Sequence, residues 1–193
     1  MNHHVGNLTV TDDNIEYAKT LTSVGRRLYI RAECELPALT SVGEWLDIQA
    51  ECELPALTSV GGWLDIQAKS ELPVLTSVGG GLEVRAECEL PALTSVGGWL
   101  GIWSKCELPA LASVGGGLDI RAECELPTLA SAYGVPGKLI AVSRYGLWKS
   151  NEGLYYAGCR QELTLDQAIN HWIDRTDKRA LKFIGAILAN LNE

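Results

Sequence analysis

The sequence lacks several features that would point directly to a site of action. It contains no apolar run of about 18 residues, so no segment is long enough to cross a membrane as a helix. It does not open with a basic segment followed by an apolar stretch, which a secretory signal requires. We therefore expect a cytoplasmic protein that does not contact a membrane.

Catalytic motifs are also scarce. The chain has three histidines, His3, His4 and His171. It has no GxSxG, HExxH or Walker pattern, and no Cys and His spacing that suits zinc. Cys159 and His171, with Arg160 or Tyr155 nearby, could form a nucleophile and base. We interpret Cys159 instead as a buried strand residue and His171 as a helix-surface residue, and we expect a protein that is not an enzyme and holds neither a metal nor a cofactor.

The most abundant feature is an 18-residue unit, LTSVGGWLDIQAECELPA, that recurs with almost no change. Its copies begin at Leu21, Leu39, Leu57, Leu75, Leu93 and Leu111, and a degenerate copy begins at Leu129. A fixed period of this length is typical of a solenoid, in which each coil buries its apolar side against its neighbours. Such scaffolds present surfaces more often than they catalyse reactions.

The pattern inside the unit predicts strands and turns. We number its positions as slots, starting from the Leu of LTSVG. Slots 1, 4, 8, 10, 14 and 16 hold Leu, Val, Leu, Ile or Val, Cys or Ser, and Leu in all six copies. Slots 8 to 12, for example Leu64 to Ala68, alternate apolar and polar residues, as a half-buried strand does. Gly at slot 5 and Pro at slot 17 mark turns, so we predict a mainly β protein built as a parallel β-solenoid.

Two kinds of solenoid fit this unit. The preferred one is right-handed and similar to leucine-rich repeats, with its strand at slots 8 to 12 and an inward Cys after it. The other is the left-handed hexapeptide helix, because 18 residues are three sixes and Val60, Ile66 and Leu72 are six apart. A hexapeptide register would point the slot-1 leucines at solvent, which is unfavourable for a column of seven. The acyltransferases of that fold also need a His on the coils, and these coils have none.

Slot 14 holds a column of small side chains. Its members are Cys34, Cys52, Ser70, Cys88, Cys106 and Cys124. Residues one coil apart in a parallel sheet lie about 4.8 Å from each other, so five thiols in a column cannot all form disulfides. Ser also replaces Cys without any other change in the repeat. We interpret these cysteines as buried, reduced thiols.

We expect three parts in the chain. Residues 1–20 form an irregular N-terminal capping coil, in which GNLTV replaces GGWLDI. Residues 21–132 form the solenoid. Residues 133–193 form a small C-terminal α+β capping module, because the 18-residue period stops near Val135-Pro136-Gly137.

The C-terminal module is predicted as a ββαα unit. A strand is expected at Leu139–Val142, and a hairpin from Tyr145–Lys149 and Leu154–Gly158 around Asn151-Glu152-Gly153. Thr164 and Gln167 form a capping box for a helix. The predicted inward residues of the two helices are Leu165, Ala168, Ile169, Trp172, Ala180, Ile184, Ile187 and Leu191. The unit is expected to pack on the final coil and to shield its edge.

The repeat resembles a known family. LPALTSVGGWLDI resembles the LPxLTSVGGxLxV repeats of phage and prophage proteins, which are themselves similar to receptor L-domain leucine-rich repeats. YGLW, YYAGCR and LTLDQAINHW in the C-terminal module look like a small module of phage proteins. The resemblance implies a phage- or prophage-encoded protein in the host cytoplasm that acts on a host factor, including a defence factor. It brings no catalytic residue with it.

Charge is concentrated on the repeats. The net charge is −8, and residues 21–128 hold 15 acidic and 7 basic side chains, whereas residues 129–193 hold 6 and 8. Slot 15 is always acidic, with Glu35, Glu53, Glu71, Glu89, Glu107 and Glu125. Such a surface disfavours direct nucleic-acid binding, although it could imitate a nucleic acid. With about 4.8 Å per coil, the solenoid has one charge per roughly 3.6 Å against about 1.7 Å for duplex DNA, so the mimic would be weak.

Tryptophan is the second outward feature of the repeat. Slot 7 holds Trp45, Trp63 and Trp99, and Trp103 lies at slot 11. Aromatic residues at a polar rim are typical anchors of protein interfaces. Each indole could instead lie flat over a neighbouring coil, where Gly81 and Gly117 leave room.

Together these patterns predict a non-enzymatic protein-binding scaffold. Its predicted contacts, with a protein partner or with a second copy of the chain, are Trp45, Trp63, Trp99, Trp103, Glu53, Glu71, Glu89 and Glu107. The alternative is a small-ligand or nucleotide-binding protein whose site lies where the solenoid meets the C-terminal module, with Arg160, His171 and Trp172 as ligands.

Overall fold

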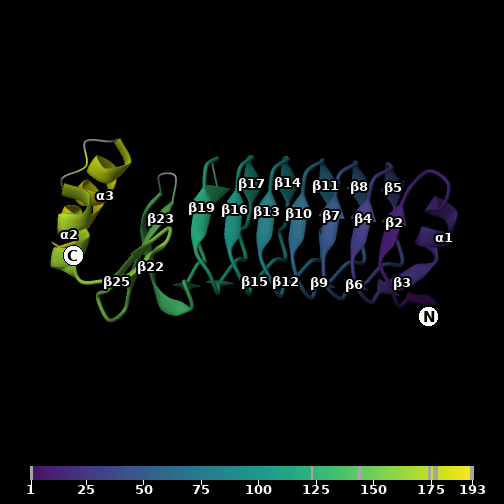
Figure 1. Cartoon of the computed structure of the whole chain (residues 1–193), viewed down its shortest axis with the longest axis horizontal. Coiled ribbons are helices and arrows are strands. Elements are labelled where there is room, and N and C mark those ends of the chain that lie inside the picture. The colour runs from purple at the N-terminus through teal and green to yellow at the C-terminus, as the bar shows by residue number, and fades with distance from the viewer. Residues whose placement is uncertain (1, 123, 143–144, 174, 176–177, 192–193) are drawn as a thin grey trace.

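The computed structural model describes residues 2–122, 124–142, 145–173, 175 and 178–191. It is a long stack of coils with the N-terminus at one end and two helices at the other (Figure 1). Each of the six full coils gives one short strand to each of three sheets, which we name A, B and C in the order in which the chain meets them. The predicted parallel β-solenoid with an 18-residue coil is therefore confirmed.

The three sheets use different slots of the repeat. Sheet A uses slots 3 and 4, in β1 (Asn2–His4), β3 (Leu21–Val24), β6 (Ser41–Val42), β9 (Ser59–Val60), β12 (Ser77–Val78), β15 (Ser95–Val96), β18 (Ser113–Val114) and β21 (Ser131–Ala132). Sheet B uses slots 8 to 10, in β2 (Leu8–Val10), β4 (Leu28–Ile30), β7 (Leu46–Ile48), β10 (Leu64–Ile66), β13 (Leu82–Val84), β16 (Leu100–Ile102) and β19 (Leu118–Ile120). Sheet C uses slots 14 and 15, in β5 (Cys34–Glu35), β8 (Cys52–Glu53), β11 (Ser70–Glu71), β14 (Cys88–Glu89), β17 (Cys106–Glu107) and β20 (Cys124–Glu125).

Pairing between coils keeps strict register. Leu64 pairs with Leu82 on one side and with Leu46 on the other, and Glu71 pairs with Glu53 and Glu89. Each slot therefore forms a column along the axis, with neighbours about 4.8 Å apart. The apolar columns point inward and form one continuous core, in which the leucines of slots 8 and 16 are almost completely buried in the central coils.

The coil combines features of the two solenoids considered from the sequence. Each coil has three sides, as expected of an 18-residue unit made of three six-residue segments. Its slot-1 leucines are buried, however; Leu57 and Leu75 have no exposed surface, whereas a hexapeptide register would expose them. The longest strand of the central coils lies at slots 8 to 10, within the predicted strand at slots 8 to 12, and an inward Cys or Ser follows at slot 14.

Close backbone contact explains the slot-5 glycines. A Cβ atom added at Gly79 would overlap the carbonyl oxygen of Gly61, and one at Gly97 would overlap that of Gly79. Because the obstructing atoms belong to the backbone, a larger side chain at slot 5 would separate the coils. This column therefore fixes how tightly the coils can pack at the turn between sheets A and B.

The N-terminal end is closed by an irregular coil. β2 continues sheet B beyond β4, and helix α1 (Ile15–Lys19) follows it. The Asn14 side chain accepts a hydrogen bond from the Thr11 N–H at 3.0 Å and donates one to the Thr9 carbonyl at 2.8 Å. These contacts occupy polar backbone groups next to an edge strand that could otherwise pair with another chain.

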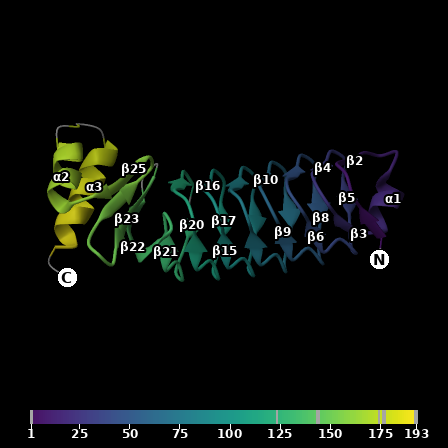
Figure 2. The same ribbon diagram turned by 60° about the horizontal axis from the view of Figure 1, so that its bottom comes forward.

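The C-terminal module contains the predicted strand, hairpin and two helices, with one further strand before the first helix, so it is larger than the predicted ββαα unit. It contains β22 (Val135–Val142), β23 (Gly146–Ser150), β24 (Tyr155–Ala157), β25 (Arg160–Leu163), α2 (Leu165–Ile173) and α3 (Lys178–Ala189). β22 pairs antiparallel with β21, so sheet A continues directly into the module. The two helices lie on the side of this sheet that faces away from the solenoid (Figure 2).

Three local predictions in the module concern one helix cap and the burial of two side chains. The capping box is confirmed, with the Thr164 N–H donating to Gln167 Oε1 at 2.9 Å and the Gln167 N–H to Thr164 Oγ1 at 3.3 Å. Leu191 was predicted to point inward and is 48% exposed, because α3 ends at Ala189 and Leu191 lies beyond the helix. Cys159 was predicted to be buried in a strand, but it is exposed between β24 and β25.

The module joins the solenoid through aromatic residues. Trp148 and Tyr156 belong to the solenoid core rather than to the core of the module. The Tyr133 ring lies 5.5 Å from that of Tyr156. The Tyr133 hydroxyl accepts a hydrogen bond from the Gly158 N–H at 2.9 Å and donates to the Gly146 carbonyl at 3.3 Å. These contacts attach the module to the last coil, as expected of a unit that packs there.

Candidate functional site

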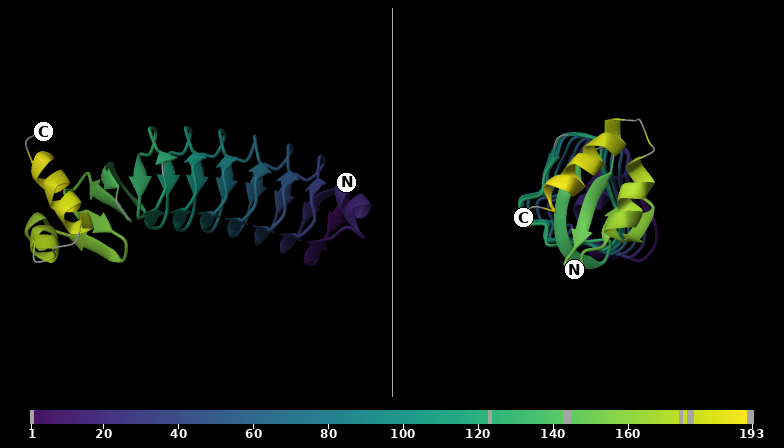
Figure 3. Two further views of the ribbon diagram at one scale, coloured as in Figure 1. Left: turned by 90° about the horizontal axis from the view of Figure 1, so that it is seen from above. Right: turned by 90° about the vertical axis from the view of Figure 1, so that its left-hand side faces the viewer.

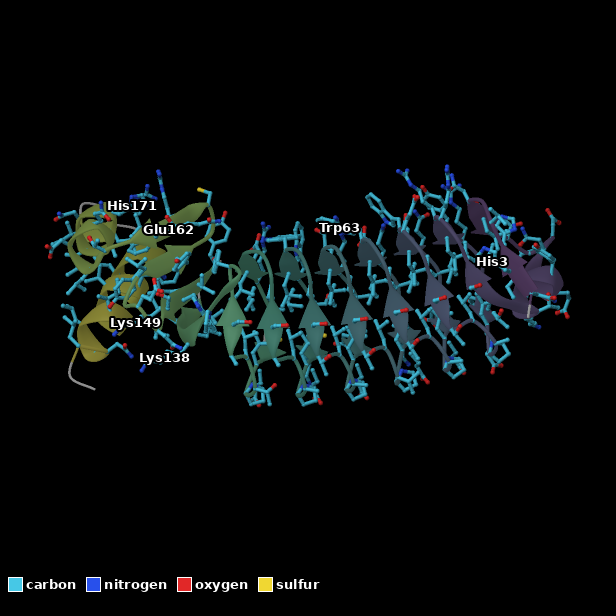
Figure 4. All side chains as sticks on the ribbon, turned by 90° about the horizontal axis from the view of Figure 1, so that it is seen from below. His3, Trp63, Lys138, Lys149, Glu162 and His171 are labelled. Carbon is cyan, nitrogen blue, oxygen red and sulfur yellow. The ribbon has the colours of Figure 1, made fainter. Side chains whose placement is uncertain are left out.

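The outer surface of sheet B, which we call face B, consists of slots 7, 9 and 11. Its slot-7 tryptophans form a row along the axis: the ring centroids of Trp45 and Trp63 are 6.1 Å apart, and those of Trp63 and Trp99 are 6.2 Å apart. The Trp63 ring lies against Gly81, where an added Cβ would come within 2.6 Å of the ring. The indoles therefore lie over the neighbouring coil, and they also remain on the outside of the solenoid, where Figure 4 labels Trp63.

A row of carboxylates lies in the middle of face B. Asp47, Asp65, Glu83 and Asp119 are all buried although they occupy the outward slot 9. The Gln67 amide donates to Asp47 at 3.0 Å and to Asp65 at 3.0 Å, so it links two coils. Burial of a charged group is costly unless it is hydrogen-bonded or paired. The slot-11 side chains supply these partners.

Arginines neutralise most of this row. Arg85 Nη2 lies 2.8 Å from Glu83 Oε2, and its Nε lies 3.4 Å from Asp65 Oδ1. Arg121 forms a two-pronged contact with Asp119 through Nε at 3.0 Å and Nη2 at 2.8 Å. Burial raises the pKa of Asp65, and the positive charge of Arg85 opposes that rise. The slot-11 arginines thus compensate most of the slot-9 carboxylates.

Trp103 lies between two of these arginines. The Arg121 guanidinium is 4.2 Å from the ring centroid of Trp103, and that of Arg85 is 4.9 Å away. Such cation–π contacts hold the ring in place. Trp103 and Trp45 each expose 37% of their surface, and Trp63 and Trp99 are half-buried. All four tryptophans singled out in the sequence therefore lie on one face.

The predicted glutamates lie on a different side of the coil. Glu53, Glu71, Glu89 and Glu107 are exposed and aligned in sheet C, whose outer surface we call face C. Three cavities of 420, 280 and 320 Å³ follow this face between slots 13 and 17. Slot 13 supplies Lys69 and Lys105 to their walls. The structure therefore divides the predicted partner-binding residues into two separate sets.

The thiols of slot 14 lie beneath face C. All six cysteines of the chain are free, and Cys52, Cys88 and Cys106 are buried. The Sγ atoms of Cys88 and Cys106 are 3.7 Å apart, and Cys52 Sγ lies 3.8 Å from Ser70 Oγ. Burial raises the pKa of the Cys52 thiol to about 12. Such thiols are poor nucleophiles and poor metal ligands near neutral pH.

The predicted ligand-binding residues of the module, Arg160, His171 and Trp172, do not form an open site with an accessible aromatic ring. Trp172 is 5% exposed, and its ring packs edge-on against His171 at 5.2 Å and Phe183 at 5.4 Å. Arg160 is exposed on β25. Burial lowers the pKa of His171, and the charges of Arg175 and Arg160 lower it further. Arg160 and His171 thus lie near each other, but the Trp172 ring is committed to the core.

Comparison of the chain with protein-family models, with curated proteins and with solved structures gave no match. In the part of the chain that the structure describes, no helix is long and apolar enough to span a membrane.

Sequence reasoning missed two residues that shape face B. Asp65 and Glu83 occupy an outward slot of the repeat, but both are covered. The signal was present, because polar or charged slot-11 residues accompany the slot-9 acids, with Gln49 beside Asp47 and Arg121 beside Asp119.

Proposed function

We propose that the chain is a non-enzymatic protein-binding scaffold that contacts its partner through face B. The observation that supports this most directly is the row of tryptophans and arginines held on a rigid sheet. Trp and Arg are the residues most often found at the energetic centres of protein interfaces. Because ring stacking and guanidinium contacts already hold these side chains, little conformational entropy remains to be lost on binding.

The resemblance of the repeat to phage proteins extends the proposal. On that basis we propose a bacterial host protein as the partner, including a defence factor, and the host cytoplasm as the place of action. The same resemblance is the basis for proposing that the solenoid is of the leucine-rich-repeat type. These steps rest on the motif and not on the chemistry of face B.

Affinity capture from host lysate tests the proposal. The bait is the intact chain, and the variant is Trp45→Ala with Trp103→Ala, the two most exposed indoles. We expect the variant to fold, because neither ring belongs to the core, and to lose the stoichiometric partner. The matched control is Glu53→Gln with Glu89→Gln on face C of the same solenoid. A partner captured equally by the tryptophan variant would contradict the proposal.

Face C supports a second candidate, an acidic mimic that occupies a nucleic-acid-binding protein. Its six glutamates are aligned at intervals of one coil, and those of β8, β11, β14 and β17 are exposed. This candidate predicts the opposite result in the same experiment: the glutamate variant loses the partner and the tryptophan variant keeps it. Added duplex DNA would then release the partner from the chain, since DNA and face C compete for the same basic site on the partner.

A further inference from the structure

An apolar stripe is uncovered at the C-terminal end of the rod. Of the nine exposed large apolar side chains in the described part of the chain, four come from residue 173 onward: Ile173, Leu181, Leu188 and Leu191. Both helices face outward at this end, as the right-hand view of Figure 3 shows. Leu181 and Leu188 are seven residues apart and so lie on one side of α3, and exposed apolar side chains that share a surface mark an interaction site.

The stripe on α3 has the spacing of a helix pair. Lys178, Leu181, Gly185 and Leu188 are separated by three, four and three residues, which places them at successive a and d positions of a heptad. The opposite side of α3 is occupied, since Ile187 and Phe183 are buried in the core of the module. A Cβ atom added at Gly185 would meet nothing within 4 Å. A second helix can therefore approach closely at the centre of the stripe.

The charge of α3 indicates which helix fits. Its first turn contains no acidic residue, and Lys178 and Lys182 lie in its N-terminal half, where the helix dipole is also positive. The described part of its C-terminal half contains no charged residue, and the dipole there is negative. Lysines near the positive end of their own helix dipole are unfavourable. In an antiparallel pair of α3 helices, the lysines of each copy lie beside the negative C-terminal half of the other, where the interaction is favourable.

The charge of the whole chain favours the same contact. Residues 21–128 hold 15 acidic and 7 basic side chains, so two solenoids side by side would repel each other. Contact through the ends keeps the acidic parts apart. We propose that α3 joins two copies of this chain in an antiparallel pair, with Leu181 of each copy against Leu188 of the other. Such a contact is isologous and closes after two copies.

Sedimentation equilibrium over a range of protein concentrations tests this contact. The range reaches about 1 mM, because a contact made mainly by two short helices is smaller than a standard interface and is expected to be weak. We expect the mass to rise from the 20.9 kDa of one chain to twice that value. Leu181→Glu and Leu188→Lys should each remain monomeric, because each places a charge against an apolar side chain in both halves of the pair.

An equimolar mixture of the two variants distinguishes this geometry from others. The introduced carboxylate and ammonium groups face each other in one half of the mixed pair, and the native leucines meet in the other half, so the doubled mass should return. Val74→Glu is the matched control, because Val74 is an exposed apolar residue of the solenoid. Unchanged melting of every variant shows that folding is intact.

Three results would overturn the proposal. The wild-type chain could remain monomeric up to the highest concentration, which would leave the stripe for a different protein. The doubled mass could persist in Leu181→Glu, which would place the contact elsewhere. The mixture could remain monomeric although each partner is folded, which would exclude the antiparallel register.

Discussion

Faces B and C belong to the same coils, but they treat acidic side chains in opposite ways. On face B each carboxylate lies beside an amide or a guanidinium. On face C glutamates follow one another in register, and each pairs across the sheet with a like charge. The comparison teaches that an acidic repeat does not make a uniformly acidic surface. On face B, the residue at slot 11, two positions after each slot-9 acid, supplies the group that pairs with the carboxylate.

The largest expected effect concerns the thiols beneath face C. If face C covers a dry interior, as face B does, Cys52 should react with iodoacetamide at least about 100-fold more slowly than the exposed Cys159 at pH 8. A thiol with a pKa of about 12 is ionised in only about one molecule in 10,000 at that pH. Peptide mapping of the labelled chain measures both rates. Equal rates would mean that face C opens to solvent.

The next effect removes a neutralised carboxylate from face B. Asp119→Asn should lower the melting temperature by about 2–4 °C, since Arg121 loses its two-pronged partner and Asp119 is only 4% exposed. Calorimetry of the intact chain gives the value. The control is Glu125→Gln in the same coil. Equal melting of Asp119→Asn and wild type would remove the distinction between the faces.

The third effect has the opposite sign. Glu53→Gln, Glu71→Gln and Glu89→Gln together should raise the melting temperature by about 1–2 °C at low salt, because three like charges leave one column. About 1 M salt should abolish the gain, since the screening length falls to about 3 Å. A gain that survives high salt would show that packing, and not charge, is responsible.

The smallest effect concerns the most weakly compensated carboxylate on face B. Burial raises the pKa of Asp65, so the folded chain binds this proton more tightly than the unfolded chain does. The charged form therefore costs stability at neutral pH, and this cost disappears as pH falls through the raised pKa. Asp65→Asn should keep or slightly raise the melting temperature at pH 7 and flatten its pH dependence in the acidic range. A fall of several degrees would show that Arg85 needs the charge.

The solenoid could be predicted from the sequence because its information repeats. One apolar slot is ambiguous, but the same residue in six copies leaves few ways to bury Leu57, Leu75 and their equivalents at once. The inward thiols and the outward tryptophans follow from that register. The aligned glutamates of face C could be predicted for the same reason, because slot 15 is Glu in all six copies.

The C-terminal module was harder to predict because none of its features recurs. The strand from Arg160 to Leu163 is polar and mostly exposed, so no alternation indicates it. Phe183 and Leu191 both suit the helical period, and only the end of α3 at Ala189 decides which is buried. The burial of Asp65 depends on long side chains that reach between coils, and the hydrophobic pattern of one coil does not contain that information.

Strict register between coils has a consequence for length. An inserted 18-residue unit would pair with its neighbours as Leu64 does with Leu82, and would leave every contact at the two ends unchanged. Its one effect would be to move the N-terminal cap about 4.8 Å further from the C-terminal module. The number of repeats thus sets the distance between the two ends of the molecule, in steps of one coil.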